Sequence, residues 1–246
     1  PLLCRILNRI DKWLIRHSLL TIQTSEGFGQ YHFGNNLPSN VVTIPNRLNP
    51  TILKLPILPH ELDCLHLRFA FVGGTRYKST LLFAQVVAKQ YPQHSFHFYG
   101  TIQKYETEIK ELCTRYPNIT YHGPFSNPND LPAIYSQIDI LVTTYDITTE
   151  NVRYAEPNKL YEACYFETPI VVTACTFLSQ RVTDWGIGYA IDGMNEETIC
   201  HFIEHISRDS LIKKQTSCHK IPKEQLINDN PHLFEKLEHI KNKTCI

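Results

Sequence analysis

The residue types best suited to bind an anion and a sugar stand together between Asn151 and Glu162. Pro157 suits the first turn of a helix, because its missing N–H group costs nothing there. Asn158 and Lys159 then stand beside the unpaired amides of that turn, where a cation and free N–H groups favour a phosphate. Glu162 lies one turn further along, in a position to accept hydrogen bonds from sugar hydroxyls. The segment therefore predicts a nucleotide-sugar site.

A second group of candidate residues follows the apolar run 67–72. Gly73 and Gly74 allow the backbone to turn sharply and to approach a ligand closely. Arg76 and Lys78 come next and place two cations in the same loop. The loop is either a phosphate-binding element or a solvated basic turn.

These two loops lie in a region where strand-like and helix-like patterns alternate. The strands are expected at 67–72, 95–100, 119–123, 138–144 and 168–173, and helices at 80–90, 102–115 and 131–137. Such alternation predicts an α/β fold, with a Rossmann-like parallel sheet and helices on both faces, whose ligands bind at the carboxyl ends of the strands. Gly100 ends the predicted strand 95–100, and Asp146 comes just after the predicted strand 138–144. Asp146 would either face the ligand or cap a turn or helix.

The first residues of the chain form a separate pattern. Residues 3–17 repeat apolar side chains at helical spacing with basic residues between them, which fits a packed helix or, less readily, a helix lying on a membrane surface. Short strands are expected at 19–24 and 41–46, and Ser25 is placed to cap a helix that begins at Glu26.

Composition places the chain among ordinary globular proteins. The 246 residues include 24 basic and 24 acidic side chains, and this balance argues against a nucleic-acid partner. Eight cysteines without a C-x-x-C pair favour reduced thiols and a cytoplasmic location. No apolar run is long enough to span a bilayer, and no signal peptide is visible. Because the chain opens with Pro1 and its single methionine is Met194, we expect it to begin inside a longer protein.

The motifs together resemble a known family, the GT-B glycosyltransferases of group 1 and group 4, which retain anomeric configuration. The resemblance runs from about Leu19 to Gly193 and rests on the segments RFAFVGGTRYKSTLL, EPNKLYEA, TPIVVT and GIGYAID. It implies that the chain is the C-terminal, donor-binding half of such an enzyme with the end of an incomplete N-terminal domain. The implied divisions are an acceptor-side remnant at 1–46, a linker at 47–66, a donor domain at 67–225 and a helical tail at 226–246.

The resemblance also assigns roles to residues. Arg76 and Lys78 would neutralise the donor diphosphate, and Glu162 matches the family glutamate that holds the nucleotide ribose. The other family glutamate would stand eight positions earlier, where this chain has Tyr154. Glu156 or Glu150 with a shifted loop, or Tyr154 and Asn158 through neutral hydrogen bonds, would replace it. Gly73, Gly74, Gly100, Asp146 and Lys159 complete the implied donor site.

The implied activity is transfer of a sugar from a nucleotide diphosphate sugar to a polysaccharide or lipid-linked saccharide. Cations and helix amides can stabilise the leaving diphosphate, so no metal or cofactor is required. The enzyme would act in the cytoplasm or peripherally at the inner face of the membrane, and would need the missing N-terminal half. The alternative is a non-catalytic, nucleotide-sugar-binding scaffold in a polysaccharide assembly complex. Residues 201–205 spell H-x-x-E-H, but a zinc site would need a further ligand from elsewhere.

Overall fold

The computed structural model describes residues 2–228 and 231–244, and its largest feature is a six-stranded parallel sheet. The spatial order of the strands is β5-β4-β3-β6-β7-β8. Their bounds are Arg68–Val72 (β3), Ser95–Tyr99 (β4), Ile119–Gly123 (β5), Ile140–Thr143 (β6), Ile170–Thr173 (β7) and Gly188–Ile191 (β8). The chain builds outward from β3 in one direction and from β6 in the other, as in a doubly wound α/β fold. The predicted fold class is confirmed.

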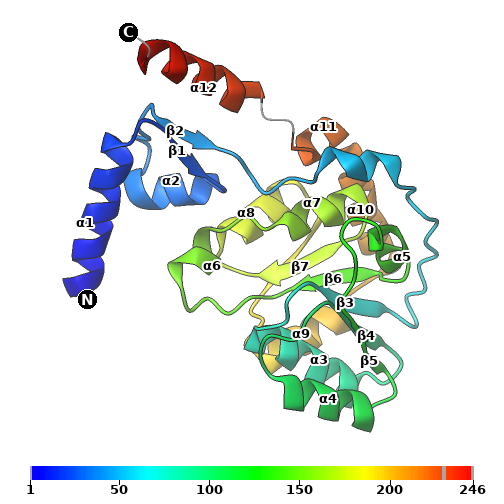
Figure 1. The fold of residues 1–246 in the computed structure, drawn as a ribbon. Coiled ribbons are helices and arrows are strands. Elements are labelled where there is room, and N and C mark those ends of the chain that lie inside the picture. Colours follow the sequence, from blue (N-terminus) through cyan, green and yellow to red (C-terminus); the bar gives the residue numbers. More distant parts are fainter. Residues whose placement is uncertain (1, 229–230, 245–246) are drawn as a thin grey trace.

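The alternation of side chains along each strand creates a hydrophobic core on both faces of the sheet. In β3, Phe69 and Phe71 point into one core, whereas Ala70 and Val72 point into the other. Helices α3 (Lys78–Gln90), α4 (Glu106–Arg115) and α9 (Glu196–Glu204) cover the first core. The second is covered by α5 (Leu131–Tyr135), α7 (Asn158–Tyr165) and α8 (Phe177–Asp184), and Figure 1 shows the resulting three layers.

Two helix starts differ from the sequence-based expectation. Helix α3 begins at Lys78 rather than at residue 80, because Asp146 accepts hydrogen bonds from the first backbone amides. Helix α4 begins at Glu106 rather than at residue 102, since Ile102 forms an isolated β-bridge with Thr75. A further short helix, α6 (Glu150–Tyr154), precedes α7.

A small unit at the start of the chain, residues 2–46, lies beside this domain (Figure 1). It contains α1 (Leu2–His17), β1 (Thr21–Gln23), α2 (Glu26–Phe33) and β2 (Val41–Thr43), and β1 pairs with β2 in parallel. Ser25 caps α2 as predicted, by accepting a hydrogen bond from the Gly27 amide.

Helix α1 does not pack as an ordinary surface helix does, because none of its described residues is buried. Its contacts with the rest of the unit include two hydrogen bonds, from His32 to Asn8 and from Asn40 to the Ile15 carbonyl, and the Arg16 guanidinium over the Phe33 ring. The opposite, apolar face is open to solvent and consists of Leu2, Leu3, Ile6, Leu7, Ile10, Trp13 and Leu14. The packing expected from its sequence is therefore not present among the described residues.

The segment that connects the two units is tied to the larger domain at several points. Leu48 and Ile52 are buried in the second core, and Ile52 lies in a 3-10 helix, η1 (Pro50–Lys54). Leu48 also forms a parallel bridge with Ile227, just after α11 (Lys223–Leu226). Helices α10 (Arg208–Lys220) and α12 (Pro231–Thr244) complete the chain.

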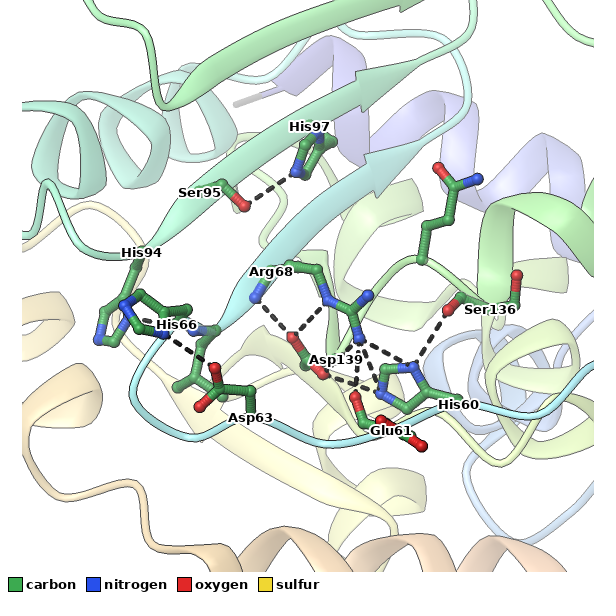
Figure 2. A network of polar contacts seen from close by, with 12 residues as sticks. His60, Glu61, Asp63, His66, Arg68, His94, Ser95, His97, Ser136 and Asp139 are labelled. Carbon is green, nitrogen blue, oxygen red and sulfur yellow. Dashed lines mark hydrogen bonds and ion pairs between the residues drawn. The ribbon is translucent and has the colours of Figure 1, made fainter.

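A polar network anchors the end of this segment at the amino edge of the sheet (Figure 2). Asp139 is fully buried and accepts hydrogen bonds from the Arg68 backbone amide and guanidinium, at 2.6–3.1 Å. His60 contacts the same carboxylate at 2.8 Å. Because hydrogen bonds from Arg68 and His60 favour the charged form, the pKa of Asp139 lies below its ordinary value despite the burial.

Candidate functional site

A cavity of about 950 Å³ opens at the carboxyl edge of the six-stranded sheet. One wall is formed by the loops after β3, β5 and β6, where the strand order reverses and doubly wound folds bind ligands. The facing wall comes from the small N-terminal unit, through residues at and after the carboxyl ends of β1 and β2. The carboxyl ends of both sheets therefore meet at one cavity.

Glycines bring the loop after β3 close to its neighbours. The Gly73 amide donates to the Tyr99 carbonyl at 2.7 Å, and Gly100 follows with φ of 120°. A Cβ atom at Gly100 would lie 2.1 Å from the Gly73 oxygen, so only glycine fits. On its other side, Gly73 lies beside the Lys159 side chain, because a Cβ there would be 3.5 Å from Lys159 Cε. The two motifs that the sequence singled out are thus adjacent.

Arg76 and Lys78 leave this loop in different ways. Arg76 is exposed and lines the cavity, where its Nε donates to the Tyr77 hydroxyl at 3.1 Å. Lys78 is also exposed but does not line the cavity, and its amide donates to Asp146 at 2.9 Å. The second oxygen of Asp146 accepts from the Ser79 amide at 2.8 Å. Asp146 therefore caps α3, one of the two roles that its sequence position allowed.

The start of α7 holds a buried cluster of charges. Lys159 Nζ lies 2.8 and 2.7 Å from the two carboxylate oxygens of Glu162, and Asn158 Nδ2 donates to one of them at 2.9 Å. The Tyr135 hydroxyl donates to the other at 2.9 Å. Burial and the charge of Glu162 raise the pKa of Tyr135 well above its ordinary value, so Tyr135 remains a donor. Asn158 and Lys159 line the cavity, whereas Glu162 lies fully buried behind them.

Tyr154 and Glu156 also have separate surroundings. The Tyr154 ring packs against Tyr31 of α2, with centroids 4.9 Å apart, and does not line the cavity. Glu156 does line it, although it is only 2% exposed. Its carboxylate accepts hydrogen bonds from the Tyr161 hydroxyl and, at 3.2 Å, from Arg181 Nε.

Several cavity residues were not anticipated from the sequence. Arg47, just after β2, lines the cavity, and its Nε is buried without a hydrogen-bond partner. Phe125 and Asn127 follow β5, and the lining also carries the amides of Asn46, Asn151 and Asn228. The signal for Arg47 and Asn127 was their place after a strand end, but nothing local to either residue shows that the ends of two different sheets meet.

Charge and hydrogen-bonding capacity decide what the cavity can hold. Arg47, Arg76 and Lys159 supply cations, of which Lys159 is paired with Glu162, while the carboxylate of Glu156 is paired with Arg181. The five asparagines and one glutamine of the lining add donors and acceptors suited to hydroxyl groups: Asn46, Asn127, Asn151, Asn158, Asn228 and Gln103. This arrangement fits an anionic, polyhydroxylated ligand. Within residues 2–228 and 231–244, no group of three or more histidine, cysteine, aspartate or glutamate side chains is arranged to hold a metal ion.

The comparison of the sequence with protein families agrees with this chemistry. Residues 66–209, more than half of the chain, match the family described as glycosyl transferases group 1. The chain belongs to the group 1 glycosyl transferases. The matched residues include both site loops and all six strands of the large sheet. No curated protein sequence matches the chain significantly.

Solved structures with the same fold include two proteins whose structures hold UDP, HepE and TarM. HepE from Anabaena, in complex with UDP and glucose, aligns with a TM-score of 0.67 and 13% identity over 94% of this chain and 66% of its own. Sucrose-phosphate synthase from Thermosynechococcus elongatus aligns with a TM-score of 0.63 and 15% identity, over 96% of this chain and 61% of its own. A point mutant of TarM from S. aureus, in complex with fondaparinux, alpha-GlcNAc-glycerol and UDP, aligns with a TM-score of 0.64 and 15% identity. The alignment covers 94% of this chain and 46% of the TarM chain. The chain thus spans about two thirds or less of their lengths.

For this group 1 transferase, the structure separates the sequence-predicted residues into two sets. Those that line the cavity are Gly73, Gly74, Arg76, Glu156, Asn158 and Lys159, and those that lie outside its lining are Lys78, Gly100, Asp146, Tyr154 and Glu162. Gly100 and Glu162 directly support lining residues, through contact with Gly73 and Lys159. Arg76 and Lys159 thus both face the cavity.

Proposed function

We propose that the cavity binds a nucleotide diphosphate sugar and that the chain forms the donor-binding part of an enzyme that transfers the sugar to a saccharide or lipid-linked acceptor. The observation that carries this proposal is the convergence of Arg47, Arg76 and Lys159 on one cavity lined by asparagine amides. The family match and the UDP ligands of the HepE and TarM structures support the same donor class. As in the family resemblance, we propose that transfer retains anomeric configuration.

The physical basis of catalysis is stabilisation of the leaving diphosphate. Negative charge accumulates on the diphosphate as the glycosidic bond breaks, so fixed cations stabilise the transition state more than the ground state. Arg76 lies in the loop after β3 and Lys159 in the first turn of α7, and the backbone amides at the start of α7 add a partial positive charge. We propose that these groups supply the electrostatic stabilisation and that transfer requires no metal.

Ribose recognition is assigned to Glu162 and Asn158, by the following exchange. In the ligand-free arrangement Lys159 neutralises Glu162 at 2.7 Å. A diphosphate beside Gly73 competes for the same ammonium group, and movement of the Lys159 side chain toward it would open the buried Glu162 carboxylate to sugar hydroxyls. Lys78 and Asp146 contribute by fixing the start of α3, and Tyr154 by holding the neighbouring unit.

Binding to donor is tested by calorimetric titration of the chain with UDP, UDP-glucose and GDP-mannose. We expect saturable binding to one nucleotide, and a loss of about tenfold or more in affinity for Arg76→Ala or Lys159→Ala, in keeping with the loss of one charged contact. Arg115→Ala is a suitable control, because Arg115 is exposed on α4, away from this cavity. No saturable binding to any of these ligands would overturn the proposal.

The proposed function also bears on where the enzyme acts and on which further domain its activity needs. No helix in the described part of the chain is long and apolar enough to cross a membrane. We propose a cytoplasmic enzyme, with peripheral contact at the inner face of the membrane, whose transferase activity needs a further N-terminal domain to hold the acceptor. Adding that domain in trans should convert a nucleotide-binding chain into an active transferase.

A second candidate function is a non-catalytic, nucleotide-sugar-binding module. The sealing of Glu162 by Lys159, Asn158 and Tyr135 favours it, as does Tyr154 at the position of a family carboxylate. A module of this kind would bind UDP-sugar without transferring or hydrolysing it, even when joined to an acceptor domain. Release of UDP from the donor, followed with that domain present, distinguishes the two functions.

A further inference from the structure

Arg181 joins the candidate site to the N-terminal unit. Its Nε donates to Glu156 Oε2 at 3.2 Å, and its terminal NH2 donates to Glu26 Oε2, also at 3.2 Å. Glu156 is the carboxylate in the cavity lining, whereas Glu26 begins α2 of the small unit. One guanidinium thus links a buried site residue to a residue 130 positions earlier in the chain.

The two ends of this link differ in exposure. The Glu156 side chain is 2% exposed, the Arg181 side chain 27% and the Glu26 side chain 60%. The bond to Glu156 therefore compensates a buried charge, whereas the bond to Glu26 is close to solvent and weak by itself. The rings of Phe177 and Trp185 lie close to this group, with centroids 5.3 and 5.7 Å from the guanidinium carbon, and restrict its orientation.

The surrounding surfaces of the two units are closely fitted. A Cβ atom at Gly27 of α2 would lie 2.7 Å from the Tyr154 oxygen and 2.9 Å from the Phe177 ring. Asn46 reaches the backbone of the site loop directly, since its Nδ2 lies 3.4 Å from the Glu156 oxygen. Contacts from α2 and from the end of β2 thus converge on the short segment 154–156.

We propose that Arg181 is a positioning residue that couples the docking of the N-terminal unit (residues 2–46) to the orientation of Glu156 in the donor cavity. This inference rests on the proposed function for its effect on donor binding. When α2 is docked, Glu156 accepts from Nε of the planar guanidinium and Glu26 from its terminal NH2, and Arg181 keeps the Glu156 carboxylate fixed. When the Glu26 contact is lost, the guanidinium can rotate, and Glu156 is left with the Tyr161 hydroxyl as its donor. Acceptor-side docking then changes the charge and shape of the donor site.

The structural half of the proposal is tested without ligand, by hydrogen exchange of the segment 150–160 in the full chain. Glu26→Gln removes the negative charge that Arg181 meets in the N-terminal unit and weakens this hydrogen bond, at a residue outside the cavity lining. We expect exchange in 150–160 to rise about threefold for Glu26→Gln and more strongly for Arg181→Gln, because a partly exposed pair contributes less than a buried one. Arg181→Lys keeps the charge but lacks the fork that reaches both carboxylates, so it should resemble Glu26→Gln.

The matched control is Glu108→Gln, which removes an exposed glutamate from α4, far from the link in the fold. If Glu26→Gln and Arg181→Lys leave exchange in 150–160 at the level of Glu108→Gln, the coupling is overturned. The test does not depend on whether Arg181→Gln folds, because the comparison of Glu26→Gln and Arg181→Lys with Glu108→Gln is sufficient.

The functional half is tested by the affinity for the nucleotide that the wild-type chain binds. We expect Glu26→Gln to weaken this affinity about threefold and Glu108→Gln to leave it unchanged, and a Glu26→Gln, Arg181→Lys double variant should be less than additive. Failure of the wild-type chain to bind any nucleotide would overturn the proposed function but not the coupling seen by exchange. Normal affinity in Glu26→Gln, with exchange raised, would overturn the role in donor binding.

Discussion

Lys159 serves two acidic groups in the proposed cycle, and its geometry explains how. Its ammonium group lies 2.7 Å from Glu162, and its stem passes beside Gly73, where the diphosphate of a donor would lie. With the Glu162 side chain 1% exposed, an unpaired charge there would be costly. Asn158 and the Tyr135 hydroxyl also donate to this carboxylate, so Lys159 can turn toward a phosphate without leaving Glu162 unsatisfied.

Arg47 gives a first prediction at this scale. Its buried Nε has no hydrogen-bond partner and lies in the cavity wall, so a bound anion would satisfy it. Arg47→Gln should therefore weaken UDP-sugar binding by about tenfold, and thermal stability should not fall, because no bond of that Nε within the protein is lost. Calorimetric titration and a melting curve check both parts. Unchanged affinity in a folded variant would exclude Arg47 from the donor site.

His97 gives a prediction on pH. Burial, followed by the nearby His122 and Arg68, lowers the pKa of His97 from 6.5 to about 4. Between these values the unfolded chain binds a proton that the folded chain does not, so the stability that is present above pH 6.5 is lost as the pH falls toward 4. The loss should reach about 2 kcal/mol, allowing for partial exposure of the ring. His97→Gln should reduce the acid sensitivity in urea unfolding at pH 7 and pH 4.5; an equal loss in both proteins would contradict it.

At the scale of elements, the contact between the β3 and β4 loops fixes the base of the cavity. Gly73 donates to Tyr99, the Thr75 amide donates to Thr101, and Gly100 leaves no room for a side chain. Two successive loops at the carboxyl edge are thereby held together by backbone groups, which do not depend on the rotamers of flexible side chains. A site on this base gains rigidity from the sheet.

The same contact predicts different costs for two glycine substitutions. Gly100→Ala would place Cβ 2.1 Å from the Gly73 oxygen at φ of 120°, so we expect a loss of about 3 kcal/mol in the free energy of unfolding and weaker donor binding. Gly123→Ala is the control, since its φ is 82° but nothing lies within 4 Å of the new atom, and it should cost about 1 kcal/mol. Urea unfolding of the two variants measures the difference. Equal losses would show that backbone strain alone matters at Gly100.

Local patterns predicted the elements well, and non-local contacts account for the rest. Apolar strands such as 68–72 and the glycines that follow them are encoded within a few residues, so the sheet and its site edge were expected. The burial of Glu162 depends on Tyr135, 27 residues earlier, and the cap on α3 depends on Asp146, 68 residues after Lys78. Neither contact has a local signature. The position of Arg47 in the cavity wall depends on how the N-terminal unit packs against the larger domain. The spacing of apolar residues in the sequence does not predict that packing.

For the whole molecule, the open surface of the N-terminal unit is the main feature. The apolar face of α1 is exposed, and β1 and β2 pair only with each other among the described residues. Two strands with an uncovered helix form a marginal structure in water. The chain also spans two thirds or less of the structures that it resembles. We therefore propose that a further domain covers α1 in the active enzyme.

This view predicts how the chain alone responds to a charge on α1. Ile10 is 47% exposed at the centre of the apolar face, so Ile10→Lys should change the free energy of unfolding of the isolated chain by less than about 0.5 kcal/mol. The same change should prevent productive assembly with an N-terminal domain supplied in trans. Urea unfolding and co-elution measure the two effects. A large destabilisation of the isolated chain would show that α1 is packed in solution.

The seating of Asp146 has a consequence for the kinetics of ligand capture. By accepting amides from both Lys78 and Ser79, it fastens the loop after β6 to the segment that follows β3, on either side of the switch point. The two loops at the base of the cavity are thus ordered before a nucleotide binds, so binding loses little conformational entropy of the chain. The association rate constant at this preordered base should therefore be governed by diffusion and charge. The slower step should be movement of the N-terminal unit, residues 2–46.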